Sequence, residues 1–437
     1  MKMQKAAFMR GTDKMILKEI EVPSIKDDEV LVSLEYVGIC GSDVHYYHHG
    51  NCGAYKVDLS QDYMLGHECA GTITAVGKDV NDLKVGDKVA LEPGITCGKC
   101  EACKSGHYNL CPDVVFLATP PVQGCNEEFI AFPADMCFKL PENVSTKAGA
   151  LIEPLSVGFY AVEQSEMNTG DTVVILGSGC IGLVTLLASK ARGAGTIIVA
   201  DLVEARLNKA LELGATHVIN SKEVDVFEKV KEITGGRNAD IVFETAGSAV
   251  TIAQTPFLTR RGGTVVLVGI AAQEEISYNF AQVMDKELTI KSVFRYKNIF
   301  PKAIAAVGSG AIDVTSIVTH EFALDDIQSY LEGLEGNNKE DYKTLITDKG
   351  LLVADSSDAG RIMKNITDSS PDLKQYLAAA QNSEESSIIA NDDVSGEKSR
   401  MIFVPVDPVG TDTKWVFGSV TTLSYANRDA NTTMVIN

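Results

Sequence analysis

The sequence lacks any apolar run long enough to form a membrane-spanning helix, which needs about 20 residues. Its first residues, MKMQKAAFMRGTDK, contain no apolar core followed by a cleavage site, so we expect no signal peptide. A surplus of positive charge is also missing, because 39 Lys and Arg residues face 59 acidic ones and the formal net charge is -20. This balance argues against nucleic acid or an anionic membrane as a partner, since both bind basic surfaces.

Cysteine is present, but ten residues in a chain of 437 are too few for a small disulfide-stapled secreted fold. The length allows two or three domains of about 100–200 residues each. We therefore expect a cytoplasmic protein in which clustered thiols bind metal or act in catalysis rather than form disulfides.

Three regions of the chain differ in their residue patterns. Residues 1–155 are rich in short β-type runs broken by glycine, such as EVLVSLEYVGI and VGDKVALEPG, which predict a β-rich, barrel-like domain. Residues 156–290 alternate apolar strand patterns with helical ones, which predicts a parallel sheet covered by helices on both faces. Residues 350–437 are rich in Ser, Asn, Asp and Thr and predict a separate C-terminal appendage.

A glycine motif opens the second region, in VVILGSGCIG. Gly177, Gly179 and Gly182 follow a predicted strand and begin a predicted helix, the context in which G-x-G-x-x-G binds a dinucleotide pyrophosphate. Asp201 ends the next strand, where a carboxylate accepts hydrogen bonds from a ribose diol and repels a 2′-phosphate. This favours NAD over NADP, although Arg206 weakens the preference because a guanidinium pairs with phosphate. The alternative is a purely structural glycine turn.

Four thiols are crowded into TCGKCEACKSGHYNLC. The spacing C-x2-C-x2-C-x7-C of Cys97, Cys100, Cys103 and Cys111 offers a closed tetrahedral shell that suits structural zinc. Disulfides or free thiols are the alternative. Since four thiolates leave no open position, we expect this zinc to take no part in catalysis.

A second set of metal-binding side chains is dispersed along the chain. Cys40, His67, Glu68 and Glu153 together supply one sulfur, one nitrogen and two carboxylates, which suits a catalytic zinc with room for water or an alcohol. Taken singly, each has an ordinary structural interpretation, as a core thiol, a hydrogen-bonded histidine or a carboxylate at a helix start.

The neighbours of Cys40 suggest a proton path. Ser42 and His45 are placed to pass a proton from a zinc-bound hydroxyl to solvent, and Asp43 is a candidate acceptor for the free N–H of a ligand histidine. Capping of a turn is the alternative role for Ser42 and Asp43.

The chain resembles the zinc-containing medium-chain dehydrogenases, and within them the sorbitol (L-iditol) and xylitol dehydrogenases. The resemblance covers roughly residues 5–348 and rests on the stretches GICGSDVHYY, LGHECAG, ALEPG, HYNLC, FLATPP, ALIEPLSVG and VFRYKN. It implies a GroES-like catalytic domain, residues 1–155 completed by 291–348, and a Rossmann NAD-binding domain, residues 156–290.

The resemblance also implies roles for further residues. Zinc would be held by Cys40, His67 and Glu68, while Glu153 would contact its water or the substrate. In the alcohol branch of the family a cysteine at the position of Glu153 ligates zinc directly, so the alternative is that Glu153 is the ligand in place of Glu68. Polyol contacts would come from Tyr46, Glu153, Arg295 and Tyr296. Cofactor contacts beyond the glycine motif and Asp201 would come from Ile181, Arg206, Val268, Gly269, Ile270, Val293, Phe294 and Arg295.

These expectations describe an enzyme that oxidises a polyol to the ketose with NAD, using one catalytic and one structural zinc in each subunit of a homodimer or homotetramer. One alternative keeps the fold but changes the substrate to another secondary alcohol, a 2,3-diol or threonine. A non-enzymatic alternative is a nucleotide- or ligand-sensing fusion protein, since residues 350–437 are similar to the second half of a Cache-type sensing domain.

Overall fold

The computed structural model describes residues 2–271 and 273–333, together with five later strands. It divides into two compact units, Met1–Thr319 with Leu324–Asp348, and His320–Ala323 with Lys349–Asn437. Across these described stretches, no helix is both long and apolar enough to cross a membrane.

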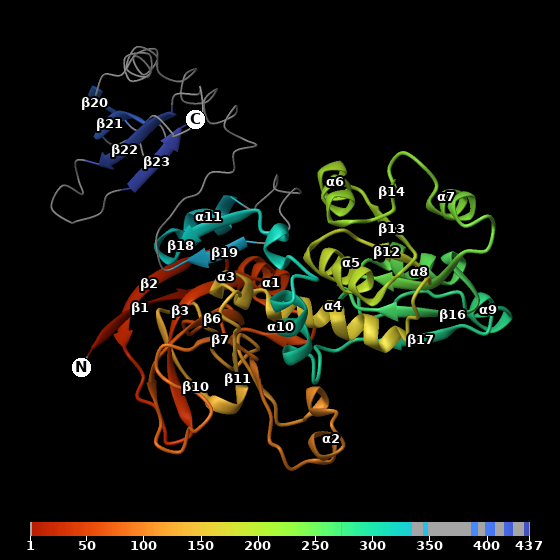
Figure 1. The fold of residues 1–437 in the computed structure, drawn as a ribbon, viewed down its shortest axis with the longest axis horizontal. Coiled ribbons are helices and arrows are strands. Elements are labelled where there is room, and N and C mark those ends of the chain that lie inside the picture. Colours follow the sequence, from red (N-terminus) through yellow and green to blue (C-terminus); the bar gives the residue numbers. More distant parts are fainter. Residues whose placement is uncertain are drawn as a thin grey trace. The chain divides into compact units, whose positions relative to one another are not determined.

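The β-rich part of the first unit is organised around β3 (Glu29–Ile39), a long and mostly buried strand (Figure 1). One edge of β3 pairs with β6, and the other edge pairs with β10 near its start and with β19 near its end. The sheet continues from β6 through β7 to β11. The bounds of these strands are β6 (Glu68–Val76), β7 (Lys88–Leu91), β10 (Phe129–Pro133), β11 (Cys137–Lys139) and β19 (Thr344–Thr347).

A six-stranded parallel sheet forms the second part, in the order β14-β13-β12-β15-β16-β17. This is the Rossmann order. Successive strands are first added on one side of β12 and then, from β15 onward, on its other side. The prediction of a parallel sheet is thereby confirmed. The strands are β12 (Thr172–Leu176), β13 (Thr196–Asp201), β14 (His217–Asn220), β15 (Ala239–Glu244), β16 (Thr259–Leu267) and β17 (Thr289–Ser292).

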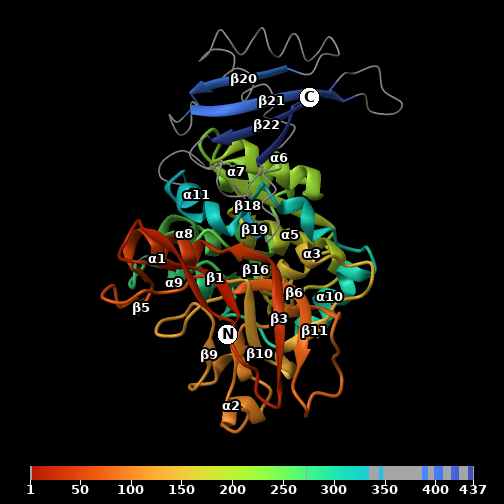
Figure 2. The ribbon, with the colours of Figure 1, turned by 90° about the vertical axis from the view of Figure 1, so that its left-hand side faces the viewer.

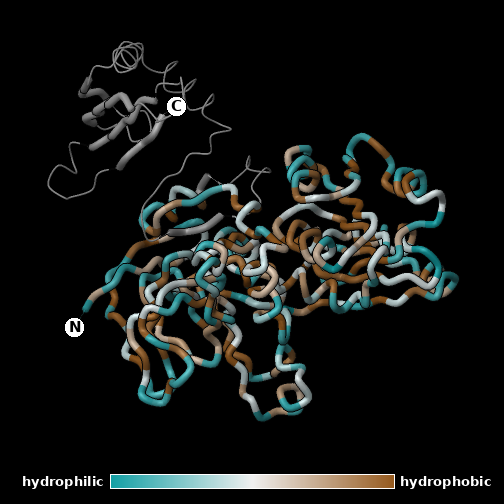
Figure 3. The backbone as a smooth tube through the Cα atoms, in the orientation of Figure 1, coloured by the Kyte–Doolittle hydropathy of each residue, from teal (hydrophilic) through white to brown (hydrophobic). Residues whose placement is uncertain are grey.

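Helices cover the parallel sheet because its central strands are apolar on both faces. Every residue of β15 is buried, as are four of the five residues of β12. Hydrophobic colours follow the interior of the structure and hydrophilic ones its outer loops (Figure 3). The covering helices include α5 (Cys180–Arg192), α6 (Glu204–Leu213), α7 (Val226–Ile233) and α8 (Ala249–Leu258), seen from the side in Figure 2.

Two segments join the parts of the first unit. Helix α4 (Ile152–Ser165) leads from the β-rich part into the parallel sheet and packs against α5 and α10 (Phe300–Gly308). After the last parallel strand the chain returns to the first sheet, where β19 pairs antiparallel with β3, with Thr344 opposite Ile39. The β-rich part is therefore built from residues far apart in the chain.

The second unit contains an antiparallel sheet in the order β20-β21-β22-β23. The Cache-like pattern of this region is a strand, a D-x-G turn, a strand, a helix and a strand pair that ends in the aromatic stretch KWVFGSV. KWVFGSV contributes most of β22. The predicted D-x-G turn and helix of that pattern lie outside the described residues. The strands are β20 (Ser386–Asn391), β21 (Lys398–Val406), β22 (Trp415–Thr422) and β23 (Thr432–Ile436).

Glu127 is a half-buried acid whose titration should affect stability. Its Oε2 accepts a hydrogen bond from Gln4 Nε2 at 3.1 Å, and burial raises the pKa of its carboxyl group to about 7. In the unfolded chain the pKa is about 4.3, so the folded state loses stability as pH rises through 7. We expect Glu127→Gln to raise Tm relative to wild type at pH 8 and to have less effect at pH 4.5, as measured by thermal melts. An equal change at both values would contradict this.

Candidate active site

Three side chains that could hold a metal ion converge at the start of helix α1 (Gly41–His49) and strand β6. Cys40 caps α1, His67 directly precedes β6, and Glu68 is the first residue of β6. One ligand atom from each lies within 4.8 Å of the other two. His67 and Glu68 are buried and Cys40 is half-buried. The structure thus brings together residues that are 27 positions apart in the sequence.

Asp43 ties the two segments together. Its Oδ2 accepts the Cys40 N–H at 2.9 Å, and its Oδ1 accepts the Gly66 N–H at 3.0 Å. Its Oδ1 also lies 3.8 Å from Nδ1 of the His67 ring. Asp43 therefore fixes the spacing between the Cys40 thiol and the His67 imidazole, as a carboxylate that orients metal ligands would.

Glu68 reaches this cluster because its neighbour on the adjacent strand has no side chain. Gly38 of β3 is opposite Glu68 in the register. A Cβ atom at Gly38 would lie only 1.9 Å from Glu68 Oε2. Glycine at this position leaves the space that the carboxylate occupies.

The donor set fits zinc. One sulfur, one imidazole nitrogen and one carboxylate are ligands that zinc accepts, and three protein ligands leave one coordination position open. The electrostatics agree, because the surroundings of His67 are negative. Burial lowers the pKa of His67, but Asp43, a hydrogen bond with Cys40 and the charge of Glu153 raise it well above its ordinary value.

Glu153 lies in α4 beside this cluster but is not one of the three side chains that approach within 4.8 Å. It is buried, and its Oε1 accepts a hydrogen bond from the Tyr296 hydroxyl at 2.9 Å. Its charge raises the pKa of Tyr296, after burial as the largest cause. Glu153 is thus held near the metal-binding group as a neighbouring carboxylate.

Arg295 lies over aromatic rings at the same site. Its guanidinium carbon lies 4.0 Å from the centre of the Phe116 ring and 4.8 Å from that of Phe294. Its Nη1 is buried and has no hydrogen-bond partner within the described part of the chain. Burial lowers the pKa of Arg295, while Tyr55, Tyr296, Glu153 and Tyr46 raise it. A half-buried guanidinium whose buried Nη1 is a spare donor is suited to binding a hydroxyl group.

The predicted proton-path residues lie on the first turns of α1. Ser42 is half-buried next to Cys40, and His45 is exposed. The centre of the His45 ring is 5.8 Å from that of His49. Partial burial and the nearby His49 and His48 lower the pKa of His45, so its imidazole is neutral at neutral pH.

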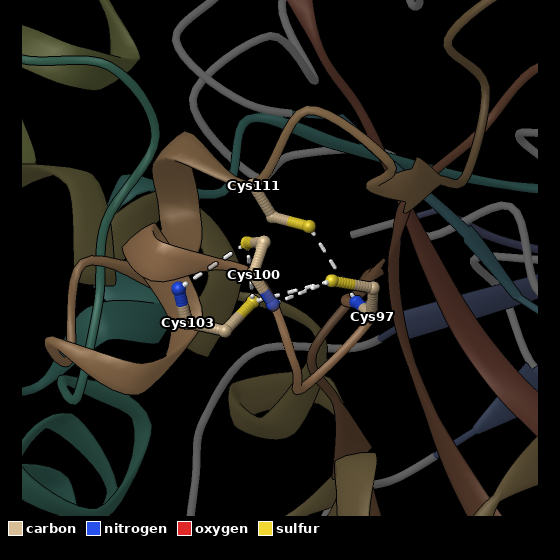
Figure 4. Close-up of side chains that lie close together, drawn as sticks. All are labelled: Cys97, Cys100, Cys103 and Cys111. Atoms are coloured by element: carbon tan, nitrogen blue, oxygen red, sulfur yellow. Dashed lines mark hydrogen bonds between the residues drawn. The ribbon is translucent and has the colours of Figure 1, made fainter.

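The four thiols of the lobe after β8 (Gly94–Ile95) face one another (Figure 4). Their sulfur atoms all lie within 4.8 Å of one another, and the Sγ atoms of Cys100 and Cys103 are 3.4 Å apart. A disulfide needs about 2.05 Å, whereas tetrahedral zinc–thiolate bonds of about 2.3 Å place sulfurs roughly 3.8 Å apart. The lobe therefore fits a metal with four thiolate ligands: Cys97, Cys100, Cys103 and Cys111.

Backbone amides support the same interpretation. The Cys100 N–H donates to Cys97 Sγ at 3.3 Å, and the Cys103 N–H donates to Cys100 Sγ at 3.4 Å. Donors from Lys99 and Cys100 lower the pKa of the Cys97 thiol to about 7. Such N–H···S contacts stabilise the thiolate form that binds metal.

The glycine turn after β12 has the geometry that its motif predicts. Gly177 has φ +98°, and a Cβ atom at Gly182 would lie 2.0 Å from the Gly177 carbonyl oxygen. Asp201 at the end of β13 accepts the Ser178 N–H at 2.6 Å through Oδ2, and its Oδ1 accepts two further amides. Ser178 Oγ donates to the Arg206 carbonyl at 3.0 Å. Asp201 and Arg206 both therefore lie beside the turn.

The remaining predicted cofactor residues lie near the same edge of the sheet. Ile181 is in the first turn of α5; Val268, Gly269 and Ile270 follow β16; and Val293, Phe294 and Arg295 follow β17. Ile270 and Phe294 are large exposed apolar residues. Because ligands of open parallel sheets bind outside the carboxyl ends of the strands, these segments form a continuous candidate cofactor surface.

Comparison with known proteins gives a consistent result. The family model described as "Alcohol dehydrogenase GroES-like domain" matches residues 26–142, and the one described as "Zinc-binding dehydrogenase" matches residues 180–309. Sorbitol dehydrogenase of Bacillus subtilis is 47% identical over 328 residues, covering 75% of this chain and 92% of the relative. The chain belongs to the zinc-containing medium-chain alcohol dehydrogenase family.

Other members of this family extend the comparison. Mouse sorbitol dehydrogenase is 41% identical over 320 residues, 72% of this chain and 88% of its own. A crystal structure of an Escherichia coli dehydrogenase of unknown specificity has 44% identity and a TM-score of 0.76, and covers 79% of this chain and 99% of its own. 2R,3R-butanediol dehydrogenase from Bacillus subtilis has 31% identity and a TM-score of 0.72, with 79% and 99% coverage. The expected family and fold are thus confirmed.

Two polar residues at the site were not singled out from the sequence. Glu92 is buried and accepts a hydrogen bond from the Tyr108 hydroxyl at 2.8 Å, and Tyr108 in turn accepts the Asn298 N–H at 2.7 Å. Burial raises the pKa of Glu92 to about 7. Both residues line a small pocket with Arg295 and Tyr296. The stretches ALEPG and HYNLC contain them, but local sequence does not reveal that they meet.

The thiol lobe gives a direct test of metal binding. We expect Cys100→Ser to lose about one of two zinc ions per subunit, because it removes one of four ligands from one of two separate groups. Tm should fall, since binding of a structural metal stabilises the fold. Metal analysis by mass spectrometry and a thermal melt measure both effects. Cys137→Ser, at a buried thiol of β11 outside both groups, should keep both ions; a variant Cys100→Ser that also keeps both would refute the assignment.

Proposed function

We propose that this chain oxidises a polyol of the sorbitol, xylitol or L-iditol type to the ketose and transfers hydride to NAD. The observation that carries the proposal is the approach of Cys40, His67 and Glu68 to within 4.8 Å. It is supported by the identity of 40–47% to sorbitol dehydrogenases from bacteria, plants and mammals.

Cys40, His67 and Glu68 would hold the catalytic zinc, which when bound lowers the pKa of a coordinated hydroxyl. Glu153, positioned by the Tyr296 hydroxyl, binds and orients the reacting end of the substrate. Ser42 and the neutral imidazole of His45 carry the proton from the site to solvent, a step that a base with a pKa near or below neutrality favours.

The cofactor would be NAD, which accepts the hydride when bound. The glycine turn and the amino end of α5 bind its pyrophosphate, and the Asp201 carboxylate accepts hydrogen bonds from the ribose diol. Val268, Gly269, Ile270, Val293 and Phe294 border the nicotinamide half of the site. The Asp201 carboxylate beside the turn disfavours the extra phosphate of NADP.

Selectivity for a polyol would come from donors beside the reacting carbon. Arg295 has a buried Nη1 that has no hydrogen-bond partner among the residues that the structure describes, and Tyr46 is a buried tyrosine of the same site. The hydroxyl of the third residue, Tyr296, already donates to Glu153. A simple alcohol has no further hydroxyls to satisfy these donors, whereas a polyol has several. An unpaired buried donor costs about 1–3 kcal/mol, which favours the polyol by roughly tenfold or more.

A substrate screen tests the proposal. Purified protein is mixed with NAD and with sorbitol, xylitol, L-iditol, 2-propanol, 2,3-butanediol or threonine, and NADH absorbance is followed. We expect the three polyols to give kcat/KM at least about tenfold above 2-propanol. Turnover of only monohydric alcohols would end the polyol assignment. The similarity to 2R,3R-butanediol dehydrogenase makes 2,3-diols the second candidate class.

The domain boundaries follow from the same proposal. A GroES-like catalytic domain would comprise residues 1–155 and 291–348, a Rossmann domain 156–290, and an appendage 350–437. We further infer a homodimer or homotetramer, as the family resemblance implies. A cytoplasmic location is supported by ten cysteines of which none forms a disulfide. The oligomer is tested by light scattering.

Removal of the appendage should leave the enzyme intact. We expect a chain that ends at Asp348 to keep both zinc ions and its polyol activity to within about twofold, because β19 and all residues of both metal groups are retained. Zinc analysis and initial rates measure this. A chain ending at Gly333 removes β19 and serves as the contrast, with a lower Tm expected. Loss of activity on cutting at Asp348 would assign the appendage a role in the enzyme.

A further inference from the structure

Glu244 is a fully buried carboxylate that neither the family motifs nor the proposed mechanism uses. It is the last residue of β15, at the carboxyl edge of the parallel sheet, and it is level with Leu176 of the neighbouring β12. β12 and β15 are the two central strands of the sheet, where the strand order reverses. A dinucleotide binds in the crevice outside this point.

The side chain of Glu244 holds the turn that follows it. Its Oε1 accepts the N–H groups of Ala246 and Gly247, each at 3.0 Å, and the hydroxyl of Thr251 at 2.7 Å. Three donors on one oxygen fix the conformation of residues 245–247, in which Gly247 has φ +63°. This carboxylate therefore accepts the hydrogen bonds that the donors of a buried turn cannot make to water.

That turn supports the glycine motif directly. The Thr245 hydroxyl donates to the carbonyl oxygens of Leu176 at 2.9 Å and Gly177 at 3.0 Å. A Cβ atom at Gly177 would lie 2.9 Å from Ala246 Cβ. The pyrophosphate-binding turn is thus packed against the turn that Glu244 holds.

The same residue also reaches the segment after β16. The backbone carbonyl of Glu244 accepts the N–H groups of Val268 at 2.9 Å and Gly269 at 3.0 Å. Cβ atoms built at Gly247 and Gly269 would lie 2.4 Å from the Ile270 carbonyl oxygen and 2.2 Å from the Gly247 nitrogen, respectively. The two loops touch without side chains between them.

The second carboxylate oxygen of Glu244 faces Gly269. A Cβ atom there would lie 2.9 Å from Oε2, and this oxygen has no hydrogen-bond partner in the stretches that the structure describes. Burial raises the pKa of Glu244, and the donors to Oε1 oppose this rise. A buried oxygen without a hydrogen-bond donor lowers the stability of the fold, so such a group calls for a functional explanation. Every loop that Glu244 contacts borders the proposed cofactor site.

We propose that Glu244 is a positioning residue of the dinucleotide site. It fixes the 245–247 turn between the pyrophosphate-binding glycine turn and the 268–270 segment. It thereby holds both segments in the conformation that binds NAD. This inference rests on the proposed use of NAD. Glu244 does not touch the reacting atoms. It lowers the free energy of binding by ordering the two loops before the cofactor arrives.

The experiment compares Glu244→Ala with Glu244→Gln in the full-length chain. The alanine variant loses the acceptor for three donors, so we expect the Kd for NAD to rise at least about tenfold. KM for NAD should rise more than kcat falls, and KM for the polyol should stay within about twofold. The glutamine variant retains a carbonyl oxygen for the same donors and should restore the Kd to within about threefold. Calorimetric titration with NAD gives Kd without turnover.

Hydrogen exchange separates positioning from simple destabilisation. The Val268 and Gly269 amides bond to the Glu244 backbone, which the alanine substitution leaves in place. We expect faster exchange at these two amides in Glu244→Ala, because the loop that packs on them is loosened. Unchanged exchange there, together with unchanged Kd for NAD, would overturn the proposal.

Asp240 provides the matched control. It is a buried carboxylate at the other end of β15, where it accepts hydrogen bonds from Arg237, Arg260 and the Thr172 amide. Asp240→Asn should lower Tm without raising the Kd for NAD. An equal rise in Kd for Asp240→Asn would mean that Glu244 acts only through domain stability. If wild-type protein itself fails to bind NAD, the proposed function fails; if wild type binds and Glu244→Ala binds equally well, only this inference fails.

Discussion

Replacing Cys40 by serine should abolish nearly all activity while the zinc of the thiol lobe stays bound. The substitution removes the sulfur from the group of Cys40, His67 and Glu68, and a hydroxyl is a poor ligand for zinc. We expect kcat/KM for the polyol to fall at least about a thousandfold, which corresponds to roughly 4 kcal/mol of lost transition-state stabilisation. Zinc content should fall by about one ion per subunit, and the affinity for NAD should change little.

Cys52 supplies the control for this experiment. It is a half-buried thiol on the strand β4 (Asn51–Cys52) that follows α1, and the charge of Cys40 contributes to a raised pKa of Cys52, after burial as the main cause. Cys52 is not part of either metal group. Cys52→Ser should therefore retain both zinc ions. If Cys40→Ser and Cys52→Ser lose the same metal and the same activity, the assignment of Cys40 as a ligand is wrong.

Replacing Glu153 by alanine should reduce turnover without removing metal or cofactor. Glu153 lies beside the three ligands rather than among them, and Tyr296 fixes its orientation. We expect kcat to fall about a hundredfold or more, the size typical of misplacing the reacting end of a substrate by about 1 Å. Zinc content and the Kd for NAD should remain within about twofold of wild type. Equal losses of turnover, zinc and NAD affinity would mean that Glu153 is structural.

Tyr296→Phe refines the test of Glu153. It removes only the hydroxyl that donates to Glu153 Oε1 at 2.9 Å. We expect a smaller loss of kcat, about tenfold, because the carboxylate remains but is less well oriented. Steady-state kinetics on both variants and on the double variant show whether the two residues act together. If the two losses simply multiply in the double variant, the residues act independently and the contact has no catalytic role.

Local patterns in the sequence were enough to predict the parallel sheet and the thiol lobe. The runs TVVIL and TIIVAD are continuous and apolar because both of their faces are covered, so they read as buried strands. The four thiols of the lobe lie within fifteen residues, so their meeting requires no knowledge of the fold. The dispersed set was harder: the types of the side chains, and not any spacing, grouped Cys40, His67, Glu68 and Glu153. Only the resemblance to a family separated the first three, as ligands, from Glu153.

Features that depend on pairing between distant segments could not be predicted. Glu92 meets Tyr108 across sixteen residues. Glu244 meets the 268–270 segment through its single backbone carbonyl, and no sequence pattern around it marks this contact. Nothing local marks Gly38 as the glycine that leaves room for Glu68. Such contacts are decided by strand register, which a single sequence specifies only through the whole sheet.

The late return of the chain to its first sheet affects how the protein is made. The half of β3 that leads into Cys40 pairs on one edge only with β19, more than three hundred residues later. At about 5–20 residues per second, a ribosome leaves this edge open for roughly 15–60 s, the period in which the whole parallel sheet is synthesised. An open strand edge invites pairing with other nascent chains. The step most exposed to misassembly during translation is therefore the one that closes the strand next to the metal-binding thiol.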